Sequence, residues 1–515
     1  TGLVTGPNVA PGPMMAPLNL NPLPGDPLNP LLDPEPLVDS DGDGNPTNDV
    51  AYYQLAAGDG WATMADGTDL YIFGFSDVTH IVTSETALAA ARPQLVTMAE
   101  VTLVNGGGGN TATGRLVRRT AGTNLLAIAN SLAATEPLKV TLTALANQLL
   151  NPNNTQNTQA MGLSVRNALR VVIADLPEEA IILRGIGPKV QSAGMLAANL
   201  AAPTMVFKEG QHAYLDLSNV GMLKRPDLFD PHTVHFHGFP QAASIFDGEP
   251  MASISIAMGG TLRYYYRIVE PGTYLYHCHV EATEHMQMGM IGNLWVTPKQ
   301  NHLPNNTPLS NLPPTNGVAR TQHKTGYKYA YNDGDGSTYY DVEAALQVTG
   351  FDKSFHEHHI AVQPLPFAAL RDDYPMINGR GYPDTIVPGT LPAPASSDFG
   401  IESQKVTSLV TAKKGQRILL RLSNVSETDI HTITVLGIPM KVVAKDARLL
   451  RGPTGLNLYY DTTSVKIGGG ETADVLLDTS SAAPGTYLLY GARLNHLSND
   501  AEDYGGLMTE IVITP

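Results

Sequence analysis

The sequence has little that could hold the chain together covalently and little that could carry it into a membrane. Only one of its 515 residues, Cys278, is a cysteine, so no disulfide can form within the chain, and cysteine usage does not report the redox compartment. Charged residues make up only 16% of the chain. No apolar run reaches the roughly 18 residues that a membrane-spanning helix needs. These absences exclude a disulfide-stapled fold and a membrane span.

Positive charge is scarce relative to negative charge. The formal net charge is −16 and the isoelectric point is about 5.3. An acidic surface disfavours nucleic acids and anionic membranes as partners and suits cationic or metal partners. The sequence begins at Thr1, without a basic segment followed by an apolar one. We interpret it as the mature form of an extracellular or periplasmic protein whose signal peptide was removed, although a fragment would look the same.

Glycine (49 residues) and proline (38 residues) are abundant, which predicts many turns and a mainly β fold. Residues 70–76 read as a first strand. Alternating apolar and polar residues predict further strands, which we place at 204–221, 261–268, 273–279 and 292–297. Residues 299–325 are polar and rich in proline and asparagine, as in a linker, and a second strand-rich block covers 326–515.

Two segments lack the strand pattern. Residues 1–50 form a predicted extended, Pro-rich arm that has little capacity for a core of its own. The arm could drape loosely over the protein or dock on a neighbouring subunit, which would give a homo-oligomer or polymer. The insertion at about 84–200 mixes Ala/Leu-rich helical stretches with short strands and carries no recognisable chemistry.

The end of the arm reads DSDGDGNPTND and places carboxylates at alternating positions around a turn. Calcium takes such hard oxygen ligands, and Asp39, Asp41, Asp43 and Asp49 are the candidates. The twelfth position, where an EF-hand has glutamate, is Val50. A solvated acidic turn is the alternative.

The single cysteine lies in an unusual neighbourhood. The segment YHCHVEATEHMQMGM supplies Cys278, then His285 seven residues later, then Met290. Two imidazoles, one thiolate and a weak axial thioether are the ligands of a blue (type 1) copper site. His232, at the end of an earlier strand-like segment, is the predicted fourth ligand. A lone histidine or methionine is more often a core residue, but six of the 15 histidines fall in these two segments.

The second block repeats the plan of the first. The segment GTYLYHCH (272–279) matches GTYLLYGA (485–492), and HTVHFHG (232–238) matches HTITVLG (431–437). We predict that His235 and His237 correspond to Thr434 and Leu436. For the other motif, we predict that His277, Cys278 and His279 correspond to Gly491, Ala492 and Arg493. The second copy should therefore keep the fold without the copper ligands.

The pattern HxxHxHG followed by HCHx₅HxxxxM resembles the copper signatures of the multicopper oxidase family. The segments HFHGFPQ, FDG (246–248) and GMIG agree with a laccase-like domain, and MINGRGYPD (376–384) resembles the start of a later domain. The resemblance implies two cupredoxin-like Greek-key β-sandwich domains. We place the copper-bearing domain at 51–298 and the degenerate one at 326–515. The Cys-to-His spacing is two residues longer than the usual laccase pattern, so the ligand loop should bulge.

The resemblance also implies a second copper site. His235, His237, His277 and His279 occupy positions that bind a trinuclear copper cluster in the family. That cluster takes eight imidazoles from two domains, and this chain offers four, so we expect a reduced type 2 or type 3 site. A type 2 site of the nitrite reductase kind would need a third ligand, in that family from a neighbouring subunit, and the candidates are His356, His358, His359, His431 and His496.

Two functions follow. The first is a copper oxidoreductase that takes single electrons from a phenol, a metal ion or a cytochrome at His285 or His232. Glu281 or Glu284 could carry protons, or could simply be solvated. The alternative is an electron-carrying or structural subunit of an extracellular assembly, without oxygen chemistry. Copper counting separates the two.

Overall fold

The structure, a computed structural model, describes residues 50–79, 184–185, 188–240, 242, 244–315 and 317–515, with a few residues between 126 and 151. The arm, its four candidate calcium ligands at 39–49 and most of the 84–200 insertion lie outside these residues, so those predictions stay untested. None of the helices in the described part is long and apolar enough to cross a membrane.

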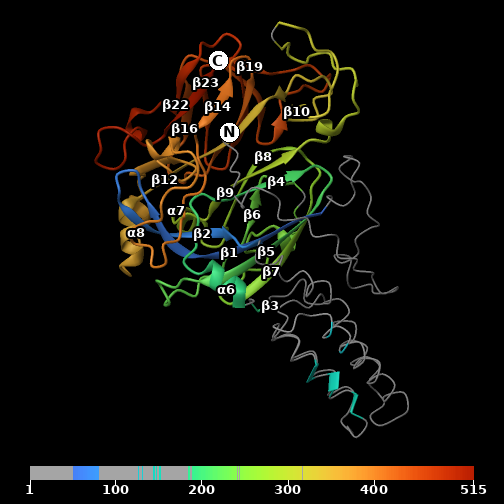
Figure 1. The fold of residues 1–515 in the computed structure, drawn as a ribbon. Helices are drawn as coiled ribbons and strands as arrows, with labels where there is room; N and C mark the ends of the chain where they lie inside the picture. Colours follow the sequence, from blue (N-terminus) through green and yellow to red (C-terminus); the bar gives the residue numbers. More distant parts are fainter. Residues whose placement is uncertain are drawn as a thin grey trace.

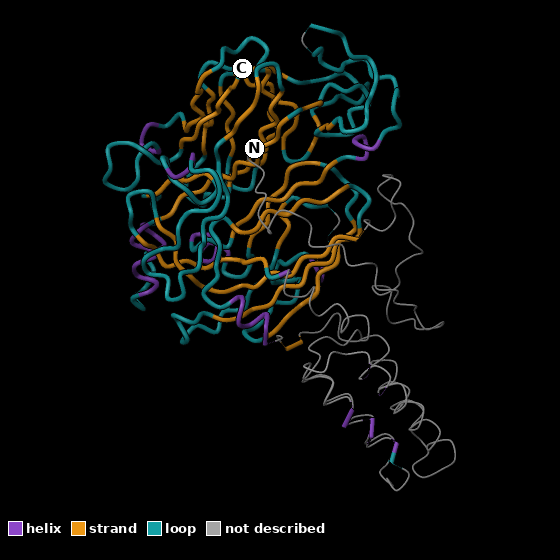
Figure 2. The backbone as a smooth tube through the Cα atoms, viewed as in Figure 1, coloured by secondary structure: helices purple, strands orange, loops and turns teal. Residues whose placement is uncertain are grey.

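The first domain is a β-sandwich built from two sheets (Figures 1 and 2). One sheet has the order β2-β1-β5-β7-β3 and the other has the order β4-β9-β8-β6. The strands are β1 (Val50–Thr63), β2 (Asp69–Asp77), β3 (Arg184–Gly185), β4 (Ala202–Lys208), β5 (His212–Gly221), β6 (His235–His237), β7 (Gly260–Arg267), β8 (Gly272–His277) and β9 (Ile291–Thr297). Its helical segments are α6 (Pro188–Gly194), η4 (Ser244–Phe246), α7 (Ala282–Gln287) and η5 (Lys299–His302).

The second domain is a sandwich of the same kind. Its sheets have the orders β13-β12-β15-β21-β17-β18, with β19 on β17, and β14-β23-β22-β16-β20. The strands are β12 (Val342–Phe351), β13 (Tyr374–Ile377), β14 (Val410–Lys413), β15 (Arg417–Asn424), β16 (His431–Val435), β17 (Met440–Lys445), β18 (Arg448–Leu449), β19 (Tyr460–Thr462), β20 (Ser464–Ile467), β21 (Thr472–Asp478), β22 (Gly485–Gly491) and β23 (Met508–Thr514). Outside the two sheets lie β10 (Lys328–Tyr329), β11 (Tyr339–Tyr340), α8 (Lys353–Ile360), η6 (Phe367–Ala369), η7 (Asp384–Ile386) and η8 (Leu494–His496).

The two domains share their strand pairings. β1 runs parallel to β5 and β4 parallel to β9 in the first domain, while β12 runs parallel to β15 and β14 parallel to β23 in the second. β8 lies between β6 and β9 just as β22 lies between β16 and β23. Both domains are cupredoxin-like sandwiches, as the repeated motifs predict.

The strands β8 and β9 of the first domain pack on the larger sheet of the second. Thr273 Oγ1 donates to Asp474 Oδ1 at 2.5 Å, and Arg421 donates to Thr273 at 3.0 Å. Asp474 and Arg421 are both buried. This polar contact fixes β8, which precedes the cysteine, against the second domain.

The structure differs from the sequence-based expectation at two elements. β1 was missed, because its segment AAGDG carries small and polar residues without alternation; both faces of this strand are buried. The predicted linker at 299–325 is packed and not free, because Leu309 and Leu312 bury against Tyr329 and Tyr339. The other predicted strands of the first domain are present within a few residues.

Candidate metal centre

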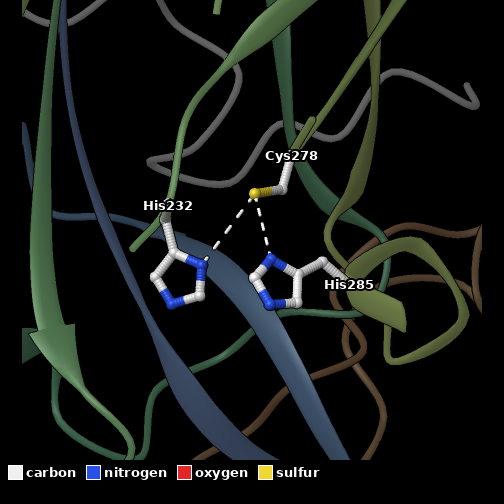
Figure 3. Close-up of side chains that lie close together, drawn as sticks. All are labelled: His232, Cys278 and His285. Carbon is white, nitrogen blue, oxygen red and sulfur yellow. Dashed lines mark hydrogen bonds between the residues drawn. The ribbon is translucent and has the colours of Figure 1, made fainter. Parts of the chain in front are cut away.

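Cys278 follows directly after β8 and is fully buried together with His232 and His285. Both imidazoles turn their Nδ1 atoms toward the sulfur (Figure 3). The distance from Cys278 Sγ is 3.2 Å to Nδ1 of His285 and 3.9 Å to Nδ1 of His232. The structure therefore brings three of the four predicted type 1 ligands together.

These distances suit a shared ion. Sulfur and nitrogen ligands bound to one tetrahedral ion at roughly 2.0–2.3 Å lie about 3.5 Å from each other. One thiolate with two imidazoles is the set that copper takes in blue sites. The backbone N–H of Thr233 points at Cys278 Sγ from 3.4 Å, an orientation that stabilises a thiolate.

Met290, the predicted axial ligand, is buried in the same apolar cluster as Cys278. Its carbonyl accepts from the N–H of Cys278 at 3.1 Å, and its own N–H donates to the carbonyl of His285 at 2.9 Å. These two backbone hydrogen bonds tie Met290 to Cys278 and to His285, and so fix the loop that carries the three residues. Met288 is equally buried in that cluster, so burial alone does not distinguish the two methionines.

The loop between Cys278 and His285 contains one helical segment, α7. Glu281 begins it with φ at 44°, a left-handed conformation that is uncommon outside glycine. The long Cys-to-His spacing is thus taken up by a helical turn. His285 lies on the buried face of this turn.

The protonation of the two histidines differs. Burial lowers the pKa of His232 far below its usual value, and His285 lowers it further. Burial also lowers the pKa of His285, but Cys278 and Asp230 outweigh burial and raise it to about 10. An ion that binds here must therefore displace a proton from His285.

The outward nitrogen of His285 points at an acidic group, of which the sequence reasoning named Glu281 and Glu284 but missed Asp230. Its Nε2 lies 3.9 Å from Oδ2 of Asp230, and ligand atoms of Glu281 and Glu284 lie within 4.8 Å of this group. Asp230 precedes His232 by two residues. The same spacing recurs at Asp429 and His431, and that repeat was the signal that could have revealed it.

The four histidines predicted for a second site also lie together. His235, His237 and His277 have ligand atoms within 4.8 Å of one another. The ring of His279 lies 4.9 Å from that of His235. His277 engages the carbonyl of Cys278 through Nδ1 at 2.8 Å, which leaves Nε2 to face His237 Nδ1 at 3.2 Å. His235 engages the carbonyl of Asp247 through Nδ1.

Burial favours the neutral form of three of these imidazoles. It lowers the pKa of His235 and His237, and it lowers the pKa of His277 to about 3. A neutral imidazole offers a free lone pair to a metal. The cluster is therefore suited to a metal without the loss of protons.

The backbone of the second domain approaches this histidine cluster at Gly470. A Cβ added at Gly470 would lie 2.7 Å from Nε2 of His237, so a larger residue there would press on this imidazole. In the described part of the chain, none of the predicted third ligands joins the group of His235, His237 and His277.

Those third-ligand candidates make other contacts. His356 engages the carbonyl of Tyr71 through Nδ1 at 2.7 Å, and His359 Nε2 lies 2.8 Å from Glu284. His358 is half-exposed and contacts Ser354 of its own helix. His431 and His496 lie beside each other within the second domain. The HEHH segment is part of α8, which packs on β2 and contacts α7 through His359 and Glu284 (Figure 1).

One predicted correspondence between the repeats is wrong by one residue. His235 lies opposite His277 in the first domain, and Thr434 lies opposite Tyr490 in the second. His277, Cys278 and His279 therefore correspond to Tyr490, Gly491 and Ala492. The prediction had stretched the second motif to reach Arg493, whereas strand pairing aligns the motifs without a gap.

Comparison with known proteins gives matches in both domains. Sequence models described as multicopper oxidase match residues 186–301 and 356–505, together slightly more than half of the chain. Multicopper oxidase MCE from Talaromyces pinophilus is 33% identical over 101 residues, which are 19% of this chain and 15% of that protein. The match thus spans a small part of that relative.

Among solved structures, blue copper oxidase from Nitrosomonas europaea is 24% identical with a TM-score of 0.43, covering 61% of this chain and 77% of that one. Copper nitrite reductase from Nitrosomonas europaea is 17% identical with a TM-score of 0.38, covering 62% and 84%. The two sequence matches, one in each sandwich, carry the assignment. The chain belongs to the multicopper oxidase family.

Proposed function

We propose that the protein is a copper oxidoreductase that takes single electrons from a reductant at His285 and delivers them to a second copper site. The observation that carries the proposal is the convergence of Cys278, His232 and His285 beside a second group of imidazoles. Copper, when bound, supplies reversible one-electron transfer at the thiolate site.

The chain's own residues would connect the two groups. Cys278 contributes its sulfur to one group, and its neighbours His277 and His279 contribute imidazoles to the other. The two groups are therefore joined by a few covalent bonds. Because all three ligands of the first group are buried, water is excluded from them.

The reductant would approach through the acidic group at His285. Asp230 and Glu284 are half-buried and Glu281 is exposed, so the group is open to solvent. Glu284 is held by His359, at 2.8 Å. Three carboxylates attract a cation such as Fe²⁺ or Mn²⁺ more than a neutral phenol.

A second function is supported by the close approach of Gly470, and not of a further histidine, to His237 from the described part of the second domain. If no further histidine completes the imidazole group, the protein would carry electrons or serve as a subunit of an assembly without reducing oxygen. A neighbouring chain could instead supply the missing ligands, which would make the oxidase a homo-oligomer. We keep a secreted location and a calcium site at 39–49 as further proposals.

Copper counting together with oxygen consumption tests the proposal. We expect blue protein with more than one copper per chain, and oxygen consumption that depends on Fe²⁺ or a phenol. His277→Gln should stop oxygen consumption while the blue colour remains. Blue protein with one copper and no oxygen consumption would support the electron carrier. Colourless copper-loaded protein would contradict both functions.

A further inference from the structure

The second domain retains half of a blue copper site. The N–H of Cys278 donates to the carbonyl of Met290, and the equivalent N–H of Gly491 donates to the carbonyl of Leu507 at 2.8 Å. The thiolate position is thus glycine and the thioether position is leucine. This part agrees with the expected loss of ligands.

The two imidazoles, however, are still present. The N–H of Leu507 donates to the carbonyl of His496 at 2.8 Å, just as the N–H of Met290 donates to that of His285. His431 pairs with Ile467 on β20, as His232 pairs with Ile256. His431 and His496 therefore occupy the positions of the two histidine ligands. The second copy therefore keeps a histidine at both of these positions.

The geometry of the pair is conserved as well as its position. The ring centroids of His431 and His496 lie 4.8 Å apart at an interplanar angle of 56°. For His232 and His285 these values are 4.8 Å and 55°. The positions of the two histidines and the mutual orientation of their rings are therefore the same in both domains.

The outer side of the pair is conserved too. Asp429 Oδ2 lies 3.0 Å from Nε2 of His496, in the place that Asp230 takes beside His285. Arg493 pairs with Asp429 and holds it. Since the carboxylate takes Nε2 of His496, the other nitrogen, Nδ1, remains for a ligand on the inner side.

His431 supplies the independent sign of a ligand. The residue is fully buried, and neither of its ring nitrogens has a hydrogen-bond partner among the described residues. An imidazole has one donor and one acceptor nitrogen, and a buried polar group left unpaired costs free energy. A bound ion between the two rings would use the lone pair of His431.

The surroundings select the ion. A Cβ at Gly491 would lie 2.7 Å from a methyl carbon of Leu507, so the leucine side chain occupies the space of the missing thiolate. Two imidazole nitrogens without a thiolate cannot balance a divalent charge well. A monovalent, soft ion that accepts two nitrogen ligands fits better, and imidazole is a copper ligand.

We infer that His431 and His496 bind one Cu⁺ ion in the second domain, at a colourless site separate from the two groups of ligands in the first domain. The site would hold copper without the thiolate that gives the blue absorption.

The test is an anaerobic count of Cu⁺ per chain, with the full chain titrated against the bicinchoninate complex of Cu⁺. We expect His431→Gln and His496→Gln each to bind one copper fewer than the unaltered chain, while the blue absorption of the oxidised first domain is unchanged. The blue absorption reports that the variant is folded. An unchanged copper count in a blue variant would overturn the inference.

A gain-of-function variant covers the case in which these variants do not fold. Gly491→Cys with Leu507→Met restores the full ligand set, and it is made in a Cys278→Ser background, where the first domain is colourless. A blue absorption after addition of Cu²⁺ supports the inference, because both imidazoles then reach one ion. A folded but colourless protein overturns it. Failure of the proposed function would show differently, as colourless unaltered protein.

Discussion

The two domains share one fold and one pattern of strand pairing, but they differ at two of the four positions that hold the predicted copper ligands in the first domain. The first domain has two imidazoles, a thiolate and a thioether at the end of the sandwich. The second has the two imidazoles, with Gly491 and Leu507 in place of the sulfur ligands. The comparison teaches that the sandwich does not depend on the metal site, because the second domain keeps its strands without a thiolate. The predictions below probe this contrast.

The largest effect is expected from Cys278→Ser. The thiolate is the ligand that the second domain lacks, so its removal should abolish the blue absorption completely. The fold should survive, with a loss of about 1–2 kcal/mol in the free energy of unfolding from the buried hydroxyl. Visible absorption and urea unfolding measure the two effects.

Met288→Leu is the matched control for the methionine ligand. Met288 is as buried as Met290 but is not the predicted ligand. We expect the blue absorption to persist in Met288→Leu and to change in position or intensity in Met290→Leu. The reverse result would assign the axial position to Met288.

The contact between the domains at Gly470 gives the next largest effect. Gly470 has φ at 82°, and an added Cβ would press on His237. Gly470→Ala should weaken copper binding at the imidazole group about 10-fold or more, a difference of about 1.4 kcal/mol, while the blue absorption is unchanged. The loss of copper is measured by counting, with mass spectrometry, the copper that stays bound after dialysis.

Gly455→Ala serves as the control for Gly470→Ala. Gly455 has φ at 83° with nothing within 4 Å of its added Cβ. It should cost a similar amount of stability, about 1 kcal/mol, without loss of copper. If both variants lost copper equally, backbone strain and not the contact with His237 would be the cause.

The paired aspartates allow a smaller, directional test. Asp230→Asn removes a negative charge beside His285, so we expect the KM for Fe²⁺ to rise about 10-fold, with little change for a neutral phenol. Asp429→Asn makes the same change in the second domain and should leave the KM for Fe²⁺ unchanged. Steady-state kinetics with both reductants measures these KM values. Equal changes in the KM for Fe²⁺ and the KM for the phenol would argue against charge attraction.

The smallest effect concerns pH and the helix α8, which links the second domain to β2 of the first. Burial lowers the pKa of His356 to about 4 in the folded chain, below the usual value of 6.5. The unfolded chain therefore binds a proton at a higher pH than the folded chain. The contribution of His356 to the free energy of unfolding should be constant above pH about 6.5 and fall by up to about 3 kcal/mol as the pH drops toward 4.

His356→Gln removes that titrating group. We expect its free energy of unfolding to fall less between pH 7 and pH 5 than that of the unaltered chain, as measured by urea unfolding at each pH. An equal fall in both proteins would place the acid sensitivity elsewhere.

Much of the site could be predicted from the sequence because its ligands cluster in two motifs. Cys278 and His285 stand in one motif, and His235 and His237 stand in the other. The spacing within each motif was therefore informative. The spacing within the motifs did not predict two further contacts: Asp230 lies near His285 through the geometry of its loop, and His359 reaches Glu284 through the packing of α8. Strand β1 was not predicted because it is buried on both faces, and its apolar and polar residues do not alternate.

The second domain's histidine pair shows a further limit. His431 was visible as a match to His232, but His496 follows Gly491 by five residues where His285 follows Cys278 by seven. Aligning the two segments without a gap therefore does not match His496 with His285. Only the hydrogen bonds of the loop, which tie His496 to Leu507, revealed the equivalence.

X-ray absorption at the copper edge of the oxidised, copper-loaded chain tests the central assignment most directly. We predict a copper with one short sulfur bond and two nitrogen bonds, and this sulfur bond should disappear in Cys278→Ser. A copper spectrum with nitrogen and oxygen neighbours alone in the unaltered chain would contradict the assignment of Cys278, His232 and His285 to a shared ion.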